Sequence, residues 1–416
     1  MAGHLGFAGI RAALGQRNFA IYTAGNAVSL VGTWMQRIAI GWLAWELTGS
    51  GFWLGLVAFA DLFPAVILGP LAGAVSDRFD RLRVAKTTQV LACIQAVSLA
   101  VLTHAGVVTI GHLVGLTFLL GTVTAFAQPA RLALVPSLVG RDRVAAAIAI
   151  NAIVFNSARF VGPAAAGAAI LGGGVELAFL ANAVSFVVAF ASLHWVRLVE
   201  ERPARKPQGL LHDMRDGIAY TVRHPGIGPV LLMFLTSTLL VRPVVELLPG
   251  FASAVFDRGA EGLAVLSAAV GTGSIVAGLH LAGRAGTEGL VRLTLLGHAG
   301  ASLALLAFTA TDALWPGALC VAIYGLFVAS SGIGTQTLVQ VAVEPGMRGR
   351  VISLYGMILR GGPAIGALAM GSASEWFGLG PPVAVGAVAT LLVALVALRG
   401  RKRLAAVLEA PGAASG

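Results

Sequence analysis

The chain has 416 residues, of which 57% are hydrophobic and only 11% are charged. An ordinary soluble domain carries about 25% charged residues, so this sequence lacks the charge needed to cover a soluble surface of this size. It is also far too apolar for a disordered chain. We therefore expect a polytopic membrane protein, in which each crossing needs about 20 mostly apolar residues.

Twelve apolar segments follow one another along the chain, each a continuous run long enough for a membrane helix. Membrane β-strands are excluded because they alternate apolar and polar residues and need only about 9–11 residues. The expected spans cover residues 19–45, 52–75, 84–104, 108–130, 145–171, 174–196, 228–252, 260–283, 289–309, 313–341, 351–373 and 381–398.

The basic residues indicate the topology. With twelve spans, both termini and every loop from an even span to the next odd span share one side. That side holds 23 of the 28 Lys and Arg residues, whereas the opposite side holds only Arg258. Basic residues gather in cytoplasmic loops, so both termini are predicted to be cytoplasmic, in a bacterial-type inner membrane. The net charge of +10 thus reflects topology, and we expect no nucleic-acid partner.

A hydrophilic stretch between spans six and seven divides the chain into two six-helix halves. The predicted parts are residues 1–199, a central loop at 200–225, and residues 226–416, which end in a short tail. Apolar residues recur with helical spacing among the charges of 210–223, which predicts an amphipathic helix on the cytoplasmic membrane surface. The expected fold class is all-α, with twelve transmembrane helices.

Spans five and eleven share a motif, an arginine within one turn before a Gly-Pro pair. The two Gly-Pro pairs are 200 residues apart, about half the chain. Glycine allows close helix packing and proline kinks a helix, so we predict a kink in each span and a duplicated half. Chance recurrence in a chain rich in glycine and alanine is the alternative. The motifs are Arg159 with Gly162-Pro163 and Arg360 with Gly362-Pro363.

Six charged side chains stand out within the expected spans, because at bilayer depth each costs about 2.5–3.5 kcal/mol on insertion scales. They are expected to persist only where they are paired, hydrated or functional. The two acids are candidate proton carriers, and the four arginines would tune them or bind anionic groups of a substrate. The acids are Asp61 and Glu246, and the arginines are Arg37, Arg159, Arg242 and Arg360.

The two acids each have a structural alternative. Arg37 and Asp61 fall at about the same depth below the periplasmic surface, roughly 12–14 Å by helix rise, so they can form an ion pair between adjacent spans, with Arg360 as a competing partner. Arg242 and Glu246 are four residues apart on span seven, so they can pair with each other. The functional alternative for this second pair is a site on a helix broken by proline.

Polar and aromatic residues in the spans are candidates to line a substrate cavity. Trp34 and Gln36 beside Arg37 suit an amphipathic molecule, through stacking and hydrogen bonds. Each further amide could instead join two helices by a hydrogen bond. The further candidates are Asn151, Asn156, Asn182, Gln336 and Gln340.

Other chemistry has no support in the sequence. The segment from Gly271 to Gly278 resembles a dinucleotide-binding loop, but no strand precedes it and we interpret it as helix packing. Cys93 and Cys320 both lie in apolar runs, which argues against a disulfide framework. The histidines show no metal-ligand spacing, so we expect no cofactor, no metal and no enzyme activity.

The loop between spans two and three resembles the signature of the major facilitator superfamily. That pattern has a glycine, three residues, Asp-Arg, and then glycine and basic residues. The sequence departs from it at Asp80, which stands where the family usually has glycine. The matching residues are Gly73, Asp77, Arg78, Arg81 and Arg83.

The resemblance covers essentially the whole chain and implies a transporter with two six-helix halves. It implies that the signature loop is a cytoplasmic latch that docks near Arg348 and Arg350 on span eleven. The segments at 128–139, 242–249 and 348–355 are similar to those of the enterobactin-exporter-like branch, which exports drugs and siderophores.

We therefore expect a secondary-active, proton-coupled exporter of a small amphipathic molecule that works by alternating access, as a monomer in the bilayer. Uptake or lysolipid flipping by the same fold is the first alternative. A non-transporting receptor or a membrane enzyme is the second, but it would need a catalytic cluster or a sizeable soluble domain.

Overall fold

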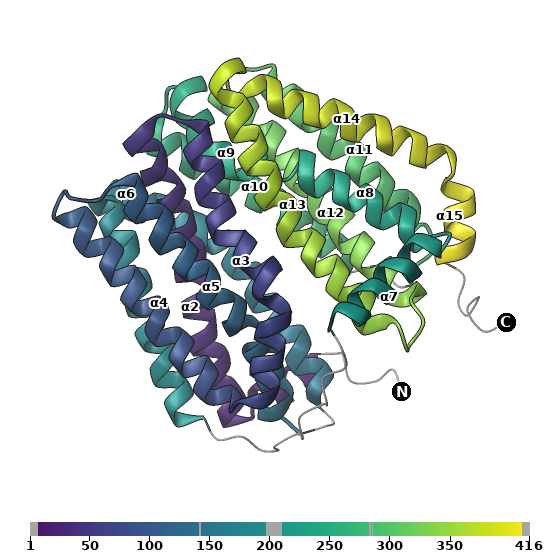
Figure 1. Ribbon diagram of the computed structural model, residues 1–416, viewed down its shortest axis with the longest axis horizontal. Helices are drawn as coiled ribbons and strands as arrows, with labels where there is room; N and C mark the ends of the chain where they lie inside the picture. Colours follow the sequence, from purple (N-terminus) through teal and green to yellow (C-terminus); the bar gives the residue numbers. More distant parts are fainter. Residues whose placement is uncertain (1–6, 141–142, 197–209, 283, 285, 410–416) are drawn as a thin grey trace. The chain divides into compact units, whose positions relative to one another are not determined.

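The computed structural model describes residues 7–140, 143–196, 210–282, 284 and 286–409 (Figure 1). This described part is almost entirely helical and contains no strand. The end of the first predicted half, most of the loop before residue 210 and the end of the tail lie outside the described residues.

Contacts divide the chain into two compact units. The N-terminal unit comprises Met1–Leu47 and Pro64–Pro207, and the C-terminal unit comprises Thr48–Phe63 and Gln208–Gly416. Each unit has hydrophobic core clusters of its own. One boundary, between Phe63 and Pro64, falls inside a long helix, so that helix contributes residues to both units.

The helices of the first part of the chain include all six spans predicted there, two of which lie on one helix. Apolar residues fill their packed faces, because association of helices within a membrane depends on close van der Waals packing. They are α1 (Phe7–Leu14), α2 (Arg17–Thr48), α3 (Gly51–Arg78), α4 (Arg81–His104), α5 (Ile110–Leu134), the 3₁₀ helix η1 (Val135–Leu138) and α6 (Val144–Trp195).

The second part begins with the helix predicted at residues 210–223, which has these bounds in the structure. Helices α11, α12 and α14 run side by side (Figure 1). The elements are α7 (Leu210–Arg223), α8 (Ile227–Leu240), α9 (Val244–Gly250), the π-helical turn η3 (Phe251–Val255), α10 (Gly259–Ala282), α11 (Leu290–Thr309), α12 (Leu314–Ala342), α13 (Arg348–Phe377), α14 (Gly380–Arg399) and α15 (Arg401–Leu408).

Ten helices among the described residues are long and apolar enough to cross a membrane. Helix α6 counts once although it covers two predicted spans, because the backbone leaves helical geometry only at Gly173 and Gly174. Gly174 has a φ of 79°, a conformation that glycine adopts without steric cost. The all-α membrane fold is confirmed, and the number of twelve spans stays a prediction.

The seventh predicted span is broken, as its prolines suggested. Helix α8 ends at Leu240, and α9 begins only at Val244, after a turn that contains Arg242 and Pro243. Proline has no N–H and its ring clashes with the preceding turn. The carbonyl oxygen of Ser237 accepts from the N–H of Val241 at 2.9 Å and of Arg242 at 3.0 Å, which closes the end of α8.

The start of α3 packs within the C-terminal unit, against α13. The Glu375 carboxylate accepts hydrogen bonds from the Ser50 hydroxyl at 2.8 Å and from the Phe52 N–H at 3.1 Å. A Cβ on Gly55 would overlap the carbonyl of Ala367. These contacts bring the stretch of α3 that carries Asp61 into the same unit as α13.

Candidate functional site

A tryptophan flanked by two arginines lies between α2 and α6 in the N-terminal unit. The guanidinium carbon of Arg37 lies 5.4 Å from the centre of the Trp34 ring, and that of Arg159 lies 5.7 Å from it. The ring of Phe155 meets Trp34 edge-on at 6.2 Å between centroids. Cations within about 6 Å of an aromatic face are attracted to it. We call these four residues the tryptophan cluster.

The tryptophan cluster is partly open. Trp34, Arg37 and Arg159 are half-buried, and 38% of the Phe155 side chain is exposed. Three of the four residues were singled out from the sequence, but Phe155 was not, because one phenylalanine in an apolar helix carries no distinguishing signal. The structure joins them because α2 and α6 pack against each other at this level.

A second aromatic pair lies 200 positions later, in the C-terminal unit. Phe234 is 200 residues after Trp34, and Tyr355 is 200 residues after Phe155. The rings of Phe234 and Tyr355 stack at 4.7 Å between centroids, with an interplanar angle of 10°. The guanidinium carbon of Arg242 lies 5.3 Å from the Phe234 ring. Phe234 is 0% exposed and Tyr355 only 6%. The repeated pair is therefore closed in the C-terminal unit and open in the N-terminal unit.

The repeated Gly-Pro motif marks equivalent helix contacts in the two units. A Cβ on Gly162 of α6 would overlap the Trp34 side chain on α2, and a Cβ on Gly362 of α13 would overlap Thr238 on α8. In each unit the motif thus packs against the helix of the first predicted span of that half. This favours the duplicated-half interpretation, while the predicted kinks stay predictions. The following prolines lie inside α6 and α13: Pro163 and Pro363.

Two predicted cavity residues belong to a buried network. Gln36 donates to Gln95 at 2.8 Å and accepts from Asn182 at 2.7 Å, and the Ser185 hydroxyl donates to the Asn182 side chain at 2.8 Å. The three amide side chains of Gln36, Gln95 and Asn182 are 0% exposed. We therefore assign Gln36 and Asn182 to joining α2, α4 and α6, in place of lining a cavity, because a buried amide is stable only when it is hydrogen-bonded.

The remaining cavity candidates differ in exposure. Asn151 is half-buried, whereas Asn156, Gln336 and Gln340 are exposed. The Asn156 amide donates to the carbonyl of Ala152 one turn earlier, at 2.8 Å. Contact of these four side chains with a substrate stays a prediction.

The candidate proton carriers lie at two different positions. Asp61 is half-buried on α3, in the C-terminal unit that also contains Arg360 on α13. Glu246 is half-buried in the first turn of α9. The pairings proposed for Asp61 stay predictions. The chain is not helical at residues 241–243, so Arg242 and Glu246 do not share the face of one continuous helix, and their pairing stays a prediction.

Arg242 interacts with residues of α11 and α12. Its guanidinium donates to the Val328 carbonyl at 3.3 Å and interacts electrostatically with His298 of α11. His298 is 1% exposed. No sequence pattern singled out this histidine, although it is the single titratable side chain of α11 beyond the first turn.

The signature loop carries a helix cap that the family pattern does not contain. The Asp80 carboxylate accepts from the backbone N–H of Leu82 at 2.8 Å and of Arg83 at 3.4 Å, and so caps the start of α4. An aspartate is favourable there because it meets unpaired N–H groups and the positive end of the helix dipole. This explains the residue that departs from the family pattern.

The other latch residues are placed as follows. Arg78 is exposed, Arg81 and Gly73 are half-buried, and a Cβ on Gly73 would meet no atom within 4 Å. The side chain of Asp77 lies outside the described residues. Arg348 is exposed and Arg350 half-buried at the start of α13. Docking of the signature loop on α13 stays a prediction.

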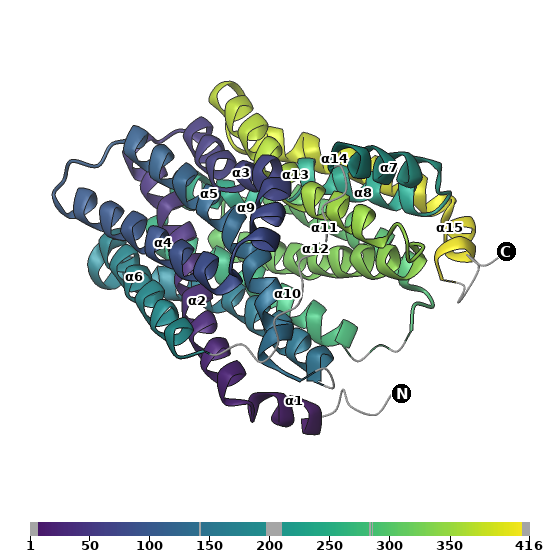
Figure 2. The same cartoon turned by 60° about the horizontal axis from the view of Figure 1, so that its bottom comes forward.

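Arg350 engages the central helix α7, a contact that no sequence motif indicated. Its guanidinium lies 3.4 Å from the Asp216 carboxylate, and Gly217 packs directly on it. One turn later the Tyr220 hydroxyl accepts from the N–H of Glu344 at 3.3 Å. Figure 2 shows α7 beside α8 and near the start of α13. These contacts anchor α7 to the loop between α12 and α13.

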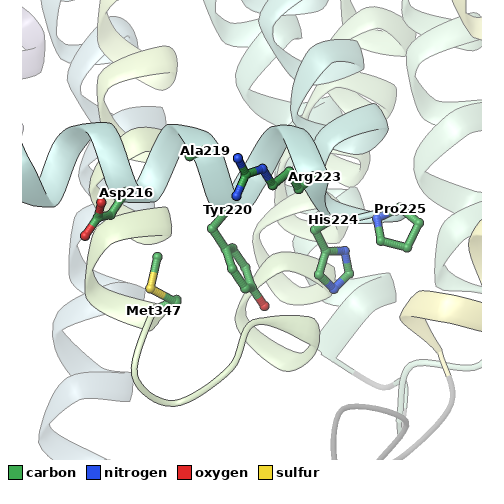
Figure 3. A pocket seen from close by; sticks show the side chains of 7 residues that line it. All are labelled: Asp216, Ala219, Tyr220, Arg223, His224, Pro225 and Met347. Carbon is green, nitrogen blue, oxygen red and sulfur yellow. The ribbon is translucent and has the colours of Figure 1, made fainter.

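A pocket of about 500 Å³ lies between α7 and this loop (Figure 3). The side chains of Tyr220 and His224 extend from the α7 side toward the loop that carries Met347. The Nδ1 of His224 accepts from the backbone N–H of Gly226 at 3.1 Å and of Ile227 at 3.0 Å. His224 therefore caps α8, and the neutral ring carries its proton on Nε2.

Acidification is expected to weaken the His224 cap. Burial lowers the pKa of His224 below its ordinary value, while Glu344 acts in the opposite direction. The unfolded chain thus binds the proton more readily, so the cap stabilises fully above about pH 6.5 and is lost as the pH falls below that value. We expect His224→Asn, which keeps an acceptor but does not titrate, to remove about 1 kcal/mol of this pH dependence. Melting temperatures across pH test this, and equal slopes in both proteins would contradict it.

Solved structures with the same arrangement define the fold class. A bacterial homologue of the human lysosomal transporter Spinster has a TM-score of 0.71 at 14% identity, covering 94% of this chain and 98% of that chain. The nucleoside transporter NupG has a TM-score of 0.67 at 14% identity, covering 92% of this chain and 98% of that chain. These similarities show the fold alone. The chain thus has the fold of the major facilitator transporters.

The family follows from the sequence. Residues 8–411 match the family described as transmembrane secretion effector. The chain therefore belongs to this family, a part of the major facilitator superfamily that the signature loop predicted. This family and the relatives named below are transporters and not enzymes.

Curated relatives align over most of their length. The staphyloferrin A transporter of Staphylococcus aureus is 24% identical over 88% of this chain and 92% of its own. Macrolide efflux protein A of Streptococcus pyogenes is 25% identical over 81% and 84%. The enterobactin exporter EntS of Escherichia coli is 26% identical over 82% and 76%.

Proposed function

We propose that the protein is a secondary-active exporter that moves a small amphipathic molecule, resembling a drug or a siderophore, out of the cell by alternating access. The observation that carries the proposal is the match of residues 8–411 to a family described as secretion effectors. Named exporters of siderophores and macrolides among the relatives support the direction. The protein would act as a monomer in the inner membrane, with both termini in the cytoplasm.

The tryptophan cluster is the proposed contact for an anionic, ring-containing part of the substrate. Two guanidinium groups beside one ring concentrate positive charge, and a guanidinium binds a carboxylate through parallel hydrogen bonds. The exposed ring of Phe155 and the half-buried ring of Trp34, which contact each other, offer a surface on which an aromatic group can stack. The buried Phe234–Tyr355 pair, at the equivalent positions, would serve packing alone.

Protons entering the cell would drive export, with Asp61 and Glu246 as the carriers. A carboxylate held at membrane depth exchanges a proton when its burial and its cationic neighbours change between conformations. Asp61→Asn and Glu246→Gln are expected to abolish accumulation driven by a pH gradient. Unchanged accumulation in either variant would remove that residue from the mechanism.

Reconstituted vesicles test the function. Counterflow and pH-gradient-driven transport would be measured with staphyloferrin A, enterobactin, a macrolide and a fluorescent lysolipid as probes, in vesicles of known orientation. Movement of one of the first three from the cytoplasmic face, coupled to proton entry, is expected. Transport toward the cytoplasm, or movement of the lysolipid alone, would favour uptake or flipping. Binding without any movement would favour a receptor.

Truncation of the tryptophan cluster is expected to weaken binding of an anionic probe. Trp34→Ala and Arg159→Gln should each raise the dissociation constant about tenfold, because each removes contacts of about 1–2 kcal/mol. Trp34→Phe should retain part of the affinity. Trp315, which is 72% exposed on α12, supplies the control Trp315→Ala. Tryptophan fluorescence titration measures the constants, and equal affinities in Trp34→Ala and Trp315→Ala would contradict the site.

A further inference from the structure

The imidazole of His298 lies deep within the C-terminal unit without a hydrogen-bond partner. It is 1% exposed, and within the described part of the chain neither ring nitrogen is bonded. A neutral imidazole has one N–H donor and one acceptor nitrogen. Leaving both unpaired in a buried site is unfavourable. His298 is the ninth residue of α11. At a helical rise of 1.5 Å per residue, it lies about 12 Å along the axis from the start of the helix.

Other buried polar atoms on the helices around His298 also have no hydrogen-bond partner among the described residues. Thr294 lies one turn before His298 on the same face of α11, and the Nε of Arg242 is unbonded although its other nitrogen donates to Val328. Side chains of α8, α11, α12, α13 and α14 belong to one core cluster. The further hydroxyls that lack a partner among the described residues are those of Ser237, Thr335 and Thr390.

In the N-terminal unit, buried polar side chains at the equivalent helices are hydrogen-bonded directly to one another. There the first, third and sixth predicted spans are joined by the amides of Gln36, Gln95 and Asn182. The equivalent seventh, ninth and twelfth spans carry other polar residues in place of these amides. They are Ser237 on α8, Thr294 and His298 on α11, and Thr390 on α14. Hydroxyls have a shorter reach than glutamine and asparagine amides. Buried polar groups without a protein partner are ordinarily satisfied by ordered water.

We propose that the C-terminal unit holds buried water at His298, between α8, α11, α12 and α14, and that His298 takes up and releases a proton through this water during transport. The role in transport rests on the proposed proton-coupled function. The hydration of the site does not.

The charged neighbours of His298 come from few elements. Arg242, in the turn between α8 and α9, interacts with the ring. The titratable group of α12 besides Cys320 is Tyr324, which is buried. Among the described residues, the charged side chains of α11, α14 and α15 lie in the first turn of α11, at the last residue of α14 and at α15. They are Arg292 on α11, Arg399 on α14, and Arg401, Lys402, Arg403 and Glu409 at α15.

Water is the only proton donor and acceptor that the protonation of His298 requires. An N–H bond forms on the unprotonated ring nitrogen as an O–H bond of a hydronium ion breaks, and neutral water remains. Release reverses this step. Imidazole suits the role because its ordinary pKa lies closest to neutrality among protein side chains. Arg242 would disfavour the imidazolium while it is close, so movement of the α8–α9 turn would control when the proton binds.

Hydrogen–deuterium exchange at the histidine C2 position tests the site without a substrate. This exchange requires D₂O at the ring and passes through the imidazolium form, so it reports both hydration and protonation. In the full chain in lipid nanodiscs, we expect His298 to exchange with a sigmoidal pH profile, more slowly than the exposed His104 and His112. No deuterium at His298 under conditions that label both references would overturn the proposal.

Two variants separate the site from the proposed function. Thr294→Val removes one hydroxyl of similar shape and should slow exchange at His298. His298→Gln should retain counterflow of whichever of staphyloferrin A, enterobactin or the macrolide the wild type carries, while pH-gradient-driven accumulation falls about tenfold. Unchanged accumulation would overturn the proton role. Absence of counterflow in the wild type would contradict the proposed function, and the exchange result would still decide the hydration of the site.

Discussion

Gly273→Leu is expected to destabilise the C-terminal unit by about 3 kcal/mol, because overpacking forces shifts in neighbouring groups. A Cβ at Gly273 of α10 would overlap the carbonyl oxygen of Ala322 and lie 2.8 Å from the N of Leu326, both backbone atoms of α12. The contact is reciprocal, since a Cβ on Gly325 would overlap the carbonyl of Val270. Neither helix can yield without moving its backbone.

Gly278→Leu supplies the matched control on the same helix. A Cβ at Gly278 meets no atom within 4 Å, so this variant adds an equal apolar volume without a clash. Melting temperature in detergent, together with monodispersity by gel filtration, measures the difference. Equal stability of the two variants would show that α10 and α12 do not pack as closely as described.

Glu409→Ala is expected to destabilise the same unit by about 2–4 kcal/mol. The two carboxylate oxygens of Glu409 accept from the N–H of Gly289 at 2.8 Å and of Val291 at 2.7 Å, at the start of α11. Hydrogen bonds to a charged group contribute about 1.5–3 kcal/mol each, and the helix dipole adds to them. The segment after α15 thereby ties the end of the chain to α11.

Glu288→Gln is the control for the charge at this position. Glu288 is exposed beside the same helix start, so its side chain should contribute little. Glu409→Gln should lose part of the effect, because one oxygen can still accept. Thermal unfolding of the four proteins, wild type included, gives the order. A Glu409→Ala melting temperature equal to that of Glu288→Gln would contradict the cap.

Much of the fold could be predicted from the sequence, because each membrane crossing requires a run of about 20 mostly apolar residues. Each predicted span falls on helical backbone within a few residues, although two spans share α6 and the seventh is divided between α8 and α9. Backbone groups in lipid must be bonded within their own segment. The interpretation of Gly271–Gly278 as helix packing is confirmed at Gly273. The break after Leu240 followed from Pro243, whose chemistry is local.

The candidate site was predicted only in part. Trp34, Arg37 and Arg159 were each selected because aromatic and charged groups are rare at membrane depth. Their common site, with Phe155 as a fourth member, required the packing of α2 on α6. The place of Gln36 in a buried network could not be read from the sequence, because an amide has the same sequence appearance whether it lines a cavity or bonds a neighbouring helix.

The sequence by itself determined the class of protein, the approximate positions of the spans and the membership in the superfamily, because composition, hydropathy and short motifs depend on local chemistry. Only the tertiary structure decided which polar residues meet. It assigned Asp80 to a helix cap, Arg350 to the contact with Asp216, and Glu409 to the start of α11. The last two assignments depend on distances between helices far apart in the chain, which no local pattern specifies.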